Sequence, residues 1–222
     1  MKKRLLFSLL GLLLTSGCKK DPPPCETIAE APPAFLAYWY FPEGSWWVYQ
    51  LQDSVPAVFD TVRVVHRWQG QVESEPGEGR LCRFGYTVRY EHSNAAYFPG
   101  VPGKKGFEAL AIEPKWSLSH YSKAGFYSMQ GHSFVYPFVI GRGVMPDDYL
   151  TADTAQLTTP AGTFARTVHV HTDYMPPDSM RYSLVRDAWR SYGVGLTKIA
   201  FSPSRTPVSG TTWELVNYHI AP

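Results

Sequence analysis

The sequence has little of three features that would each point to a particular class of protein. It has only three cysteines, and no two of them form the C-x2-C pair typical of a structural zinc site. Its longest apolar run, Leu5–Leu14, is about half of the roughly 20 residues that a membrane-spanning helix needs. Its charges nearly balance, with 21 Lys and Arg against 19 Asp and Glu, so no basic surplus indicates a nucleic-acid partner.

Common catalytic and nucleotide-binding motifs are also missing. The chain contains neither the G-x-S-x-G turn of an α/β-hydrolase nor the H-E-x-x-H pattern of a zinc protease. Gly193-Val194-Gly195 lacks the third glycine and the strand-to-helix context of a dinucleotide site, so it indicates a bulge or tight bend before a strand. We therefore expect a protein that is not an enzyme and that needs no cofactor.

The first eighteen residues have the order of a secretory signal. Three basic residues at 2–4 precede the apolar run, and the small residues Ser16 and Gly17 precede Cys18. The segment Leu14–Cys18 resembles a lipobox, in which the cysteine thiol is acylated before cleavage, although Thr15 stands where Leu is usual. We predict a signal peptide over residues 1–17 and lipidation at Cys18; the alternative is an ordinary secretory signal followed by an unrelated cysteine.

The residue after the predicted cleavage site bears on location. Lys19, where an Asp would favour retention in the inner membrane, leads us to expect an outer-membrane lipoprotein that faces the periplasm. Residues 18–34 contain two proline clusters and are expected to form an extended tether, with a single domain over 35–222. Since residues 1–17 hold three basic and no acidic groups, the remaining chain has 18 basic against 19 acidic residues, a formal charge of −1.

If Cys18 is acylated, two cysteines remain. An even number of cysteines in an oxidising compartment favours a disulfide, and we predict one between Cys25 and Cys82. Such a bond would hold the tether against the domain. Two free or buried thiols are the alternative, because spacing alone fixes no geometry.

Alternating polarity and frequent Gly and Pro favour strands over helices. The alternation over Thr61–Trp68 has a period of two and predicts a strand. Gly44 is expected to lead into an aromatic strand, and one helical turn is predicted near Arg186–Tyr192. Further strands are predicted at Leu81–Glu91, Phe107–Ile112, Gly125–Met129, Thr163–Thr172, Arg181–Arg186, Leu196–Phe201 and Thr211–Ile220. The pattern predicts an all-β domain built on a curved antiparallel sheet or half-barrel.

One pair of histidines is a candidate for metal binding. On a strand, His169 and His171 would project from the same face, and Asp173 could add a carboxylate. No second His or Cys cluster in the sequence completes a coordination shell, so we predict no metal. We expect the seven Trp and many Tyr to serve mainly as packing residues of the sheet.

Three segments carry a resemblance to known proteins. Near the start lies Tyr40–Tyr49. In the middle, Tyr136–Gly141 precedes Thr159–Phe164, and at the end, Tyr192–Lys198 precedes Trp213–Tyr218. In this order they resemble a large set of Bacteroidota proteins that are secreted or lipid-anchored. In shape that set looks like the half-barrels of the LolA/LolB lipoprotein carriers and of the periplasmic DUF3108 family. The resemblance spans about residues 38–220, and its motifs are structural rather than catalytic.

Together these observations favour an envelope lipoprotein over a soluble enzyme. The expected role is to bind an apolar ligand such as a lipid, or to act as a subunit of an envelope assembly. Glycan binding through stacked aromatic residues is the alternative, and a metal-dependent hydrolase using His169 and His171 is the weakest one. The expected partners are the membrane, through the acyl anchor, and an apolar ligand or an envelope protein.

Overall fold

The structure, a computed structural model, describes residues 30–72, 83–93, 106–112, 119–121, 148–172, 185–201 and 212–222. These residues contain one short helix, α2 (Pro33–Leu36), and ten strands. The strands are β1 (Trp46–Leu51), β2 (Phe59–Val72), β3 (Arg83–His92), β4 (Gly106–Ile112), β5 (Ser119–Tyr121), β6 (Asp148–Thr159), β7 (Gly162–Thr172), β8 (Val185–Ser191), β9 (Gly195–Phe201) and β10 (Thr212–His219). The prediction of an all-β fold is confirmed.

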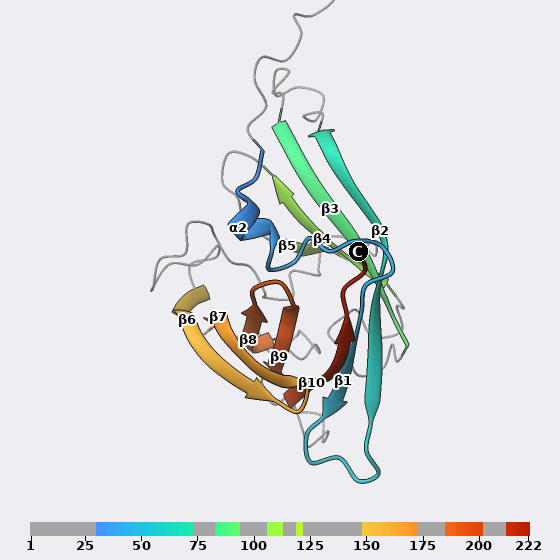
Figure 1. The fold of residues 1–222 in the computed structure, drawn as a ribbon, viewed down its shortest axis with the longest axis vertical. Coiled ribbons are helices and arrows are strands. Elements are labelled where there is room, and N and C mark those ends of the chain that lie inside the picture. Colours follow the sequence, from blue (N-terminus) through green and yellow to red (C-terminus); the bar gives the residue numbers. More distant parts are fainter. Residues whose placement is uncertain are drawn as a thin grey trace, which may run out of the picture.

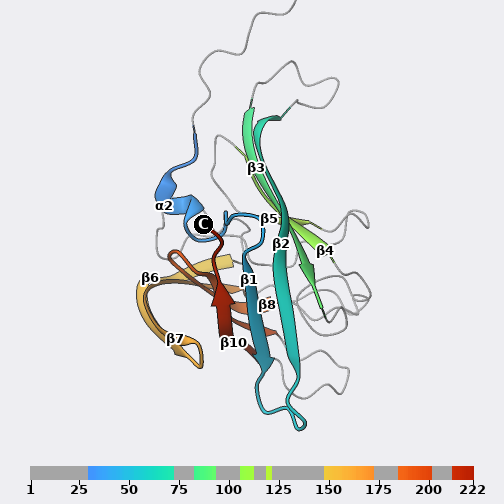
Figure 2. The same cartoon turned by 45° about the vertical axis from the view of Figure 1, so that its right-hand side comes forward.

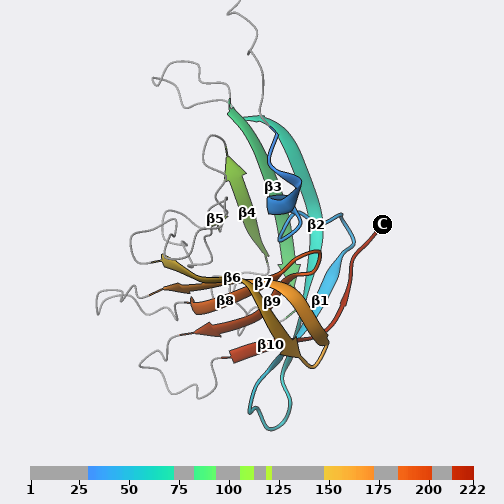
Figure 3. The ribbon, with the colours of Figure 1, turned by 60° about the vertical axis from the view of Figure 1, so that its left-hand side comes forward.

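All ten strands belong to one antiparallel sheet in the order β5-β4-β3-β2-β1-β10-β9-β8-β7-β6. Two runs of consecutive strands, β1–β5 and β6–β10, meet where β1 pairs with β10. The sheet is strongly curved, so that β6–β9 lie across the direction of β2–β4 (Figure 1; Figure 3). β5 and β6 are its two edges, and the described sheet is therefore curved but open.

The segment around α2 occupies the bend of the sheet (Figure 1). Pro33 starts the helix, where its missing N–H costs nothing. The segment is bonded to both halves of the sheet, because Tyr90 Oη donates to the carbonyl of Trp39 at 2.7 Å and Gly193 N–H donates to that of Ala37 at 2.8 Å. Ala31, inside the tether predicted over residues 18–34, is buried, and residues 33 and 34 belong to α2. The last residues of the predicted tether are therefore part of the folded domain.

Aromatic side chains fill the interior. Along β1, Trp47, Tyr49 and Leu51 are buried, while the residues between them are half-exposed, as the period of a strand requires. The polar ends of these aromatics are satisfied: Trp47 Nε1 donates to Val194 O at 2.6 Å, and Tyr49 Oη donates to Leu196 O at 2.7 Å. The fully buried side chains include Phe35, Tyr38, Trp39, Val88, Val168, Ile199, Trp213 and Leu215.

Most of the predicted strands are present, and one prediction is wrong. The helical turn expected near Arg186–Tyr192 is strand β8, in which the buried Ala188 and Arg190 alternate with the less buried Asp187 and Trp189. Strands β5 and β6 were not predicted, and of the strand predicted at Arg181–Arg186 the described residues 185 and 186 belong to β8. The glycines 193 and 195 have φ of 71° and 94° and form the turn between β8 and β9, which confirms the predicted bend. The strand predicted at Gly125–Met129 lies outside the described residues.

Candidate functional site

The longest strand extends past its neighbour. β1 pairs with β2 only over Phe59–Arg63, whereas β3 pairs with β2 as far as Val72. Figure 2 shows β2 and β3 running on beyond the end of β1 as a projecting hairpin. We call the side of β2 that faces away from β3, over residues 64–72, the β2 edge. Among the described residues, only Glu43, Gly44 and Ser45 bond to it.

Glu43 closes the first part of the β2 edge with its side chain. After Val64 exchanges backbone bonds with Gly44 and Ser45, the next outward N–H is that of Arg67, and it donates to Glu43 Oε1 at 2.9 Å. His66 Nδ1 lies 3.1 Å from the same oxygen. The Arg67 N–H and then His66 lower the pKa of the Glu43 carboxyl. A charged side chain thus occupies the position that a neighbouring strand's carbonyl would take.

Beyond Arg67 the edge carries no charge. The sequence of residues 68–72 is Trp-Gln-Gly-Gln-Val. Trp68 is 40% exposed, and its indole lies over Gly70, where a Cβ would come within 2.6 Å of the ring. Residues 65–69 are all exposed, which is unusual for a strand inside a sheet. Exposed, uncharged strand edges without proline are the places where proteins accept another strand.

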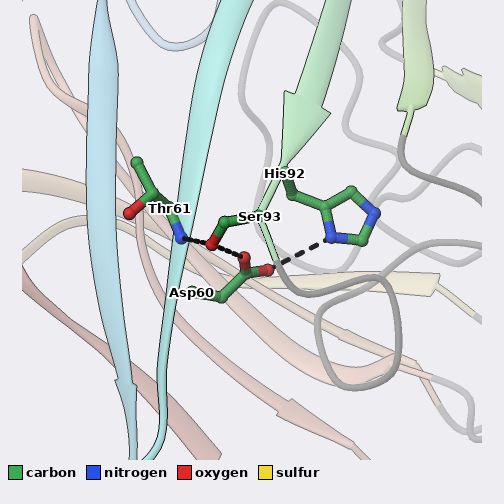
Figure 4. Close-up of polar contacts among 4 residues, drawn as sticks. All are labelled: Asp60, Thr61, His92 and Ser93. Atoms are coloured by element: carbon green, nitrogen blue, oxygen red, sulfur yellow. Dashed lines mark hydrogen bonds and ion pairs between the residues drawn. The ribbon is translucent and has the colours of Figure 1, made fainter.

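A buried polar network fixes the base of this hairpin (Figure 4). Asp60, on β2, accepts a hydrogen bond from Ser93 Oγ at 2.8 Å, and its other oxygen lies 3.2 Å from His92 Nδ1. Ser93 Oγ in turn accepts from Thr61 N–H at 2.9 Å. The side chains of Asp60 and His92 are fully buried. Because the network joins β2 to the end of β3, it sets the point at which the two strands leave the body.

The same residues do not form a catalytic triad. In a triad the serine donates to the histidine, and the carboxylate orients the histidine from the other side. Here Ser93 and His92 both contact Asp60, each on its own oxygen. A fully buried imidazole also offers no access to substrate. The arrangement therefore supports a structural role.

A second polar cluster lies on the outer face of β7 and β8. His169 Nε2 and His171 Nδ1 lie 2.9 Å and 2.7 Å from the same atom, Asp187 Oδ1. The sequence correctly predicts that the two imidazoles share a face. The carboxylate that they contact comes from β8, whereas Asp173, the predicted third group, lies outside the described residues.

An aromatic and ionic row continues this cluster across the sheet. The ring of His169 stacks on Trp189 at 4.3 Å and 6°, and Lys198 Nζ lies 5.5 Å from the centre of the same indole. Lys198 then pairs with Glu214 Oε1 at 2.7 Å. Since β7 and β9 flank β8 on opposite sides, His169 and Lys198 approach the indole from opposite sides. The row is thus held together by its own side chains.

Both imidazoles of this cluster are within hydrogen-bonding distance of the Asp187 carboxylate. Burial lowers the pKa of His169, and the nearby Asp187 only partly offsets this effect. Among the residues that the structure describes, no three His, Cys, Asp or Glu side chains have the geometry of a metal site. The described contacts of the cluster are those of side chains on neighbouring strands.

The three predicted modification sites, Cys18, Cys25 and Cys82, lie outside the described residues. In the described part of the chain, no helix is long and apolar enough to cross a membrane. Sequence reasoning missed Glu43, Asp60 and Asp187. Asp60 could have been suspected, because it continues the buried positions of Val62 and Val64 at a period of two; Glu43 and Asp187 carry no such signal.

Comparisons with known proteins add a likeness in shape. No family model matches the sequence, and no curated protein matches it. A solved structure that is similar is that of a candidate lipoprotein from Parabacteroides distasonis. It has 15% sequence identity and a TM-score of 0.40, and the match covers 82% of this chain and 99% of the other. A likeness at this level assigns no function to the chain.

Proposed function

We propose that this chain is a non-catalytic subunit of an envelope assembly, anchored in the outer membrane on its periplasmic side by an acylated Cys18, and that it docks to another protein through the β2 edge. The observation that carries the proposal is the projecting hairpin, whose β2 strand is exposed over residues 65–69 and has no charged residue over 68–72. The lipobox-like segment before Cys18 supports the anchor.

Strand addition explains how such an edge would bind. An extended segment that pairs with β2 gains backbone hydrogen bonds, and side chains beside the edge add selectivity. Trp68 and Val65, at 40% and 38% exposed, supply apolar contact area next to that edge. The buried Asp60 network holds the hairpin in place, so little order would have to be gained on docking.

Three other functions receive less support from the described residues. An apolar guest would need space on the core side of the sheet, where α2 and the aromatic residues that follow it are already packed. A sugar ring would need an open aromatic face, but His169 and Lys198 lie against the indole of Trp189, and the guanidinium of Arg166 lies 3.9 Å from the centre of the exposed Tyr192 ring. A metal-dependent hydrolase lacks a suitable ligand group among the described residues.

The experiment compares two positions in intact cells of the source organism. A photo-reactive amino acid at position 68 is expected to form adducts with protein. The same residue at Thr158, which is exposed on β6, is the matched control and should form few. If position 68 gives no protein adduct and organic extraction of the purified protein recovers a stoichiometric lipid, the assembly function is wrong and lipid binding replaces it.

A further inference from the structure

We infer that the protein occupying the β2 edge is a second copy of this chain, whose own β2 edge pairs with it in antiparallel orientation around Gln69. This inference rests on the proposed function and names its partner. The two sheets would then continue into each other across a two-fold axis. Such an interface is isologous, since each copy contributes the same strand.

The backbone of β2 presents its hydrogen-bonding groups to this edge in a regular way. The N–H of Arg67 points to the β2 edge, because it reaches Glu43 rather than β3. The pairing of β2 with β3 has no irregularity after His66. With a period of two, the N–H and carbonyl groups of Gln69 and Gln71 therefore point to the same edge.

The register follows from the length of the open segment. After the irregularity between Val64 and His66, the regular part of β2 runs over residues 66–72, and its midpoint is Gln69. A two-fold axis at this midpoint pairs every residue of the segment, whereas any other centre leaves residues at the ends without a partner. Gln69 then lies opposite its own copy, and Arg67 lies opposite Gln71.

Charge and shape are compatible with this register. No like charges would lie opposite each other in this register, because residues 68–72 are uncharged and Arg67 would be paired with position 71, a glutamine. Centring on Arg67 instead would oppose two guanidinium groups. Trp68 lies opposite Gly70, the residue over which the partner's own indole lies. In this register the Trp68 indoles of the two copies would approach each other over Gly70, which has no side chain to keep them apart.

Glu43 competes with this pairing. Its carboxylate accepts from the Arg67 N–H, which the carbonyl of Gln71 of the second copy would need. Pairing thus requires this side chain to move, and it is half-exposed and free to do so. Glu43 accordingly limits self-association, and removing its carboxylate should strengthen it.

The test uses the mature chain, residues 18–222, with Cys18→Ser, so that neither the acyl group nor the apolar run of residues 5–14 is present. Sedimentation equilibrium should show a dimer. Gln69→Lys, which places two ammonium groups opposite each other, should raise the dimer dissociation constant by about tenfold or more. Glu43→Ala should lower it. Far-UV circular dichroism checks that both variants fold, which is expected because both residues are exposed.

Cysteine pairing tests the register. Gln69→Cys should form an intermolecular disulfide under mild oxidation, since opposed residues of a hydrogen-bonded pair have Cα atoms about 5.5 Å apart. Gln71→Cys, in the same background with the same native cysteines, should not. Its two copies would lie four residues apart along the strands, or about 13 Å.

The outcomes separate the two proposals. A chain that stays monomeric with and without Glu43, or a dimer that Gln69→Lys does not weaken, overturns the inference of a second copy. If position 68 still forms adducts with other proteins in cells, the proposed assembly function stands with a different partner. If position 68 forms no protein adduct at all, the proposed function fails with it.

Discussion

Replacing Gly195 by alanine should destabilise the protein more than the same change at Gly193, two residues earlier in the same turn. Both glycines have positive φ, 71° at Gly193 and 94° at Gly195. Their surroundings differ. A Cβ at Gly193 would meet nothing within 4 Å, whereas a Cβ at Gly195 would lie 2.8 Å from Cε2 of Phe41. The comparison therefore separates backbone strain from a steric clash.

The magnitudes follow from these two contributions. An L-residue in the left-handed region costs about 1–2 kcal/mol, which is the whole loss expected for Gly193→Ala. Gly195→Ala adds overpacking of about 1–3 kcal/mol. Phe41 cannot easily move away, because it is buried and its ring packs edge-on against Trp47 at 5.3 Å. The total loss for Gly195→Ala is therefore about 2–5 kcal/mol.

Urea unfolding of the Cys18→Ser chain measures both losses as shifts in the midpoint at constant slope. A double-mutant cycle with Phe41→Leu isolates the contact, because leucine lacks the outer ring atoms. The loss in the Gly195→Ala, Phe41→Leu double variant should be smaller than the sum of the single losses by about 1–3 kcal/mol. Equal losses at both glycines, or a coupling energy within about 0.5 kcal/mol of zero, would show that the packing of Phe41 against the turn is wrong.

Four further predictions concern the anchor, the cysteines and the two polar clusters. The wild-type protein should partition into the detergent phase and Cys18→Ser into the aqueous phase; recovery of both in the aqueous phase would refute lipidation. Alkylation without reductant, followed by intact-mass measurement, should leave Cys25 and Cys82 unlabelled, and two labelled thiols would refute the disulfide. Asp60→Ala should cost about 1–3 kcal/mol in the free energy of unfolding, because it removes the buried acceptor that Ser93 Oγ donates to and that contacts His92 Nδ1, whereas the exposed control Glu91→Ala should cost less than about 0.5 kcal/mol. Burial lowers the pKa of His169 in the folded chain, so its contribution to stability is complete above the unfolded value of about 6.5 and is lost as pH falls below it; His169→Gln should flatten that fall, and an unchanged pH profile would contradict it.

Part of the architecture could be predicted because some strands alternate apolar and polar residues with a period of two. In β2, Val62 and Val64 are separated by the charged Arg63, and in β10, Trp213 and Leu215 are separated by Glu214; both alternations match the buried positions. β1 was predicted instead from its aromatic residues after Gly44. Strand β6 gives no such signal, since Asp148–Thr159 contains few large apolar residues and pairs irregularly with β7. Strand β8 was mistaken for a helical turn because Arg190, a cation, occupies a buried position.

The candidate site was harder to predict, because its parts come from different strands. A period of two correctly placed His169 and His171 on one face, but only the register of β7 against β8 brings Asp187 to them. Glu43 reaches the β2 edge from a turn 24 residues away, and Asp60 meets His92 across 32 residues. Such meetings depend on where each strand ends, which is the feature that local sequence specifies least.

The aromatic residues of this chain could bind an apolar ligand or pack against one another, and the contacts of the segment after α2 favour packing. Phe35, Trp39 and Phe41 belong to the same buried cluster as the strands on both sides of the bend. An acyl chain entering that space would have to displace side chains whose burial stabilises the fold by about 1.5–3 kcal/mol each. Among the described contacts of the β2 edge, the proposed docking would displace the half-exposed carboxylate of Glu43 and would add backbone hydrogen bonds. For this sheet, recognition at an edge therefore costs less than recognition in the interior, which is the physical reason to look for its partner along β2.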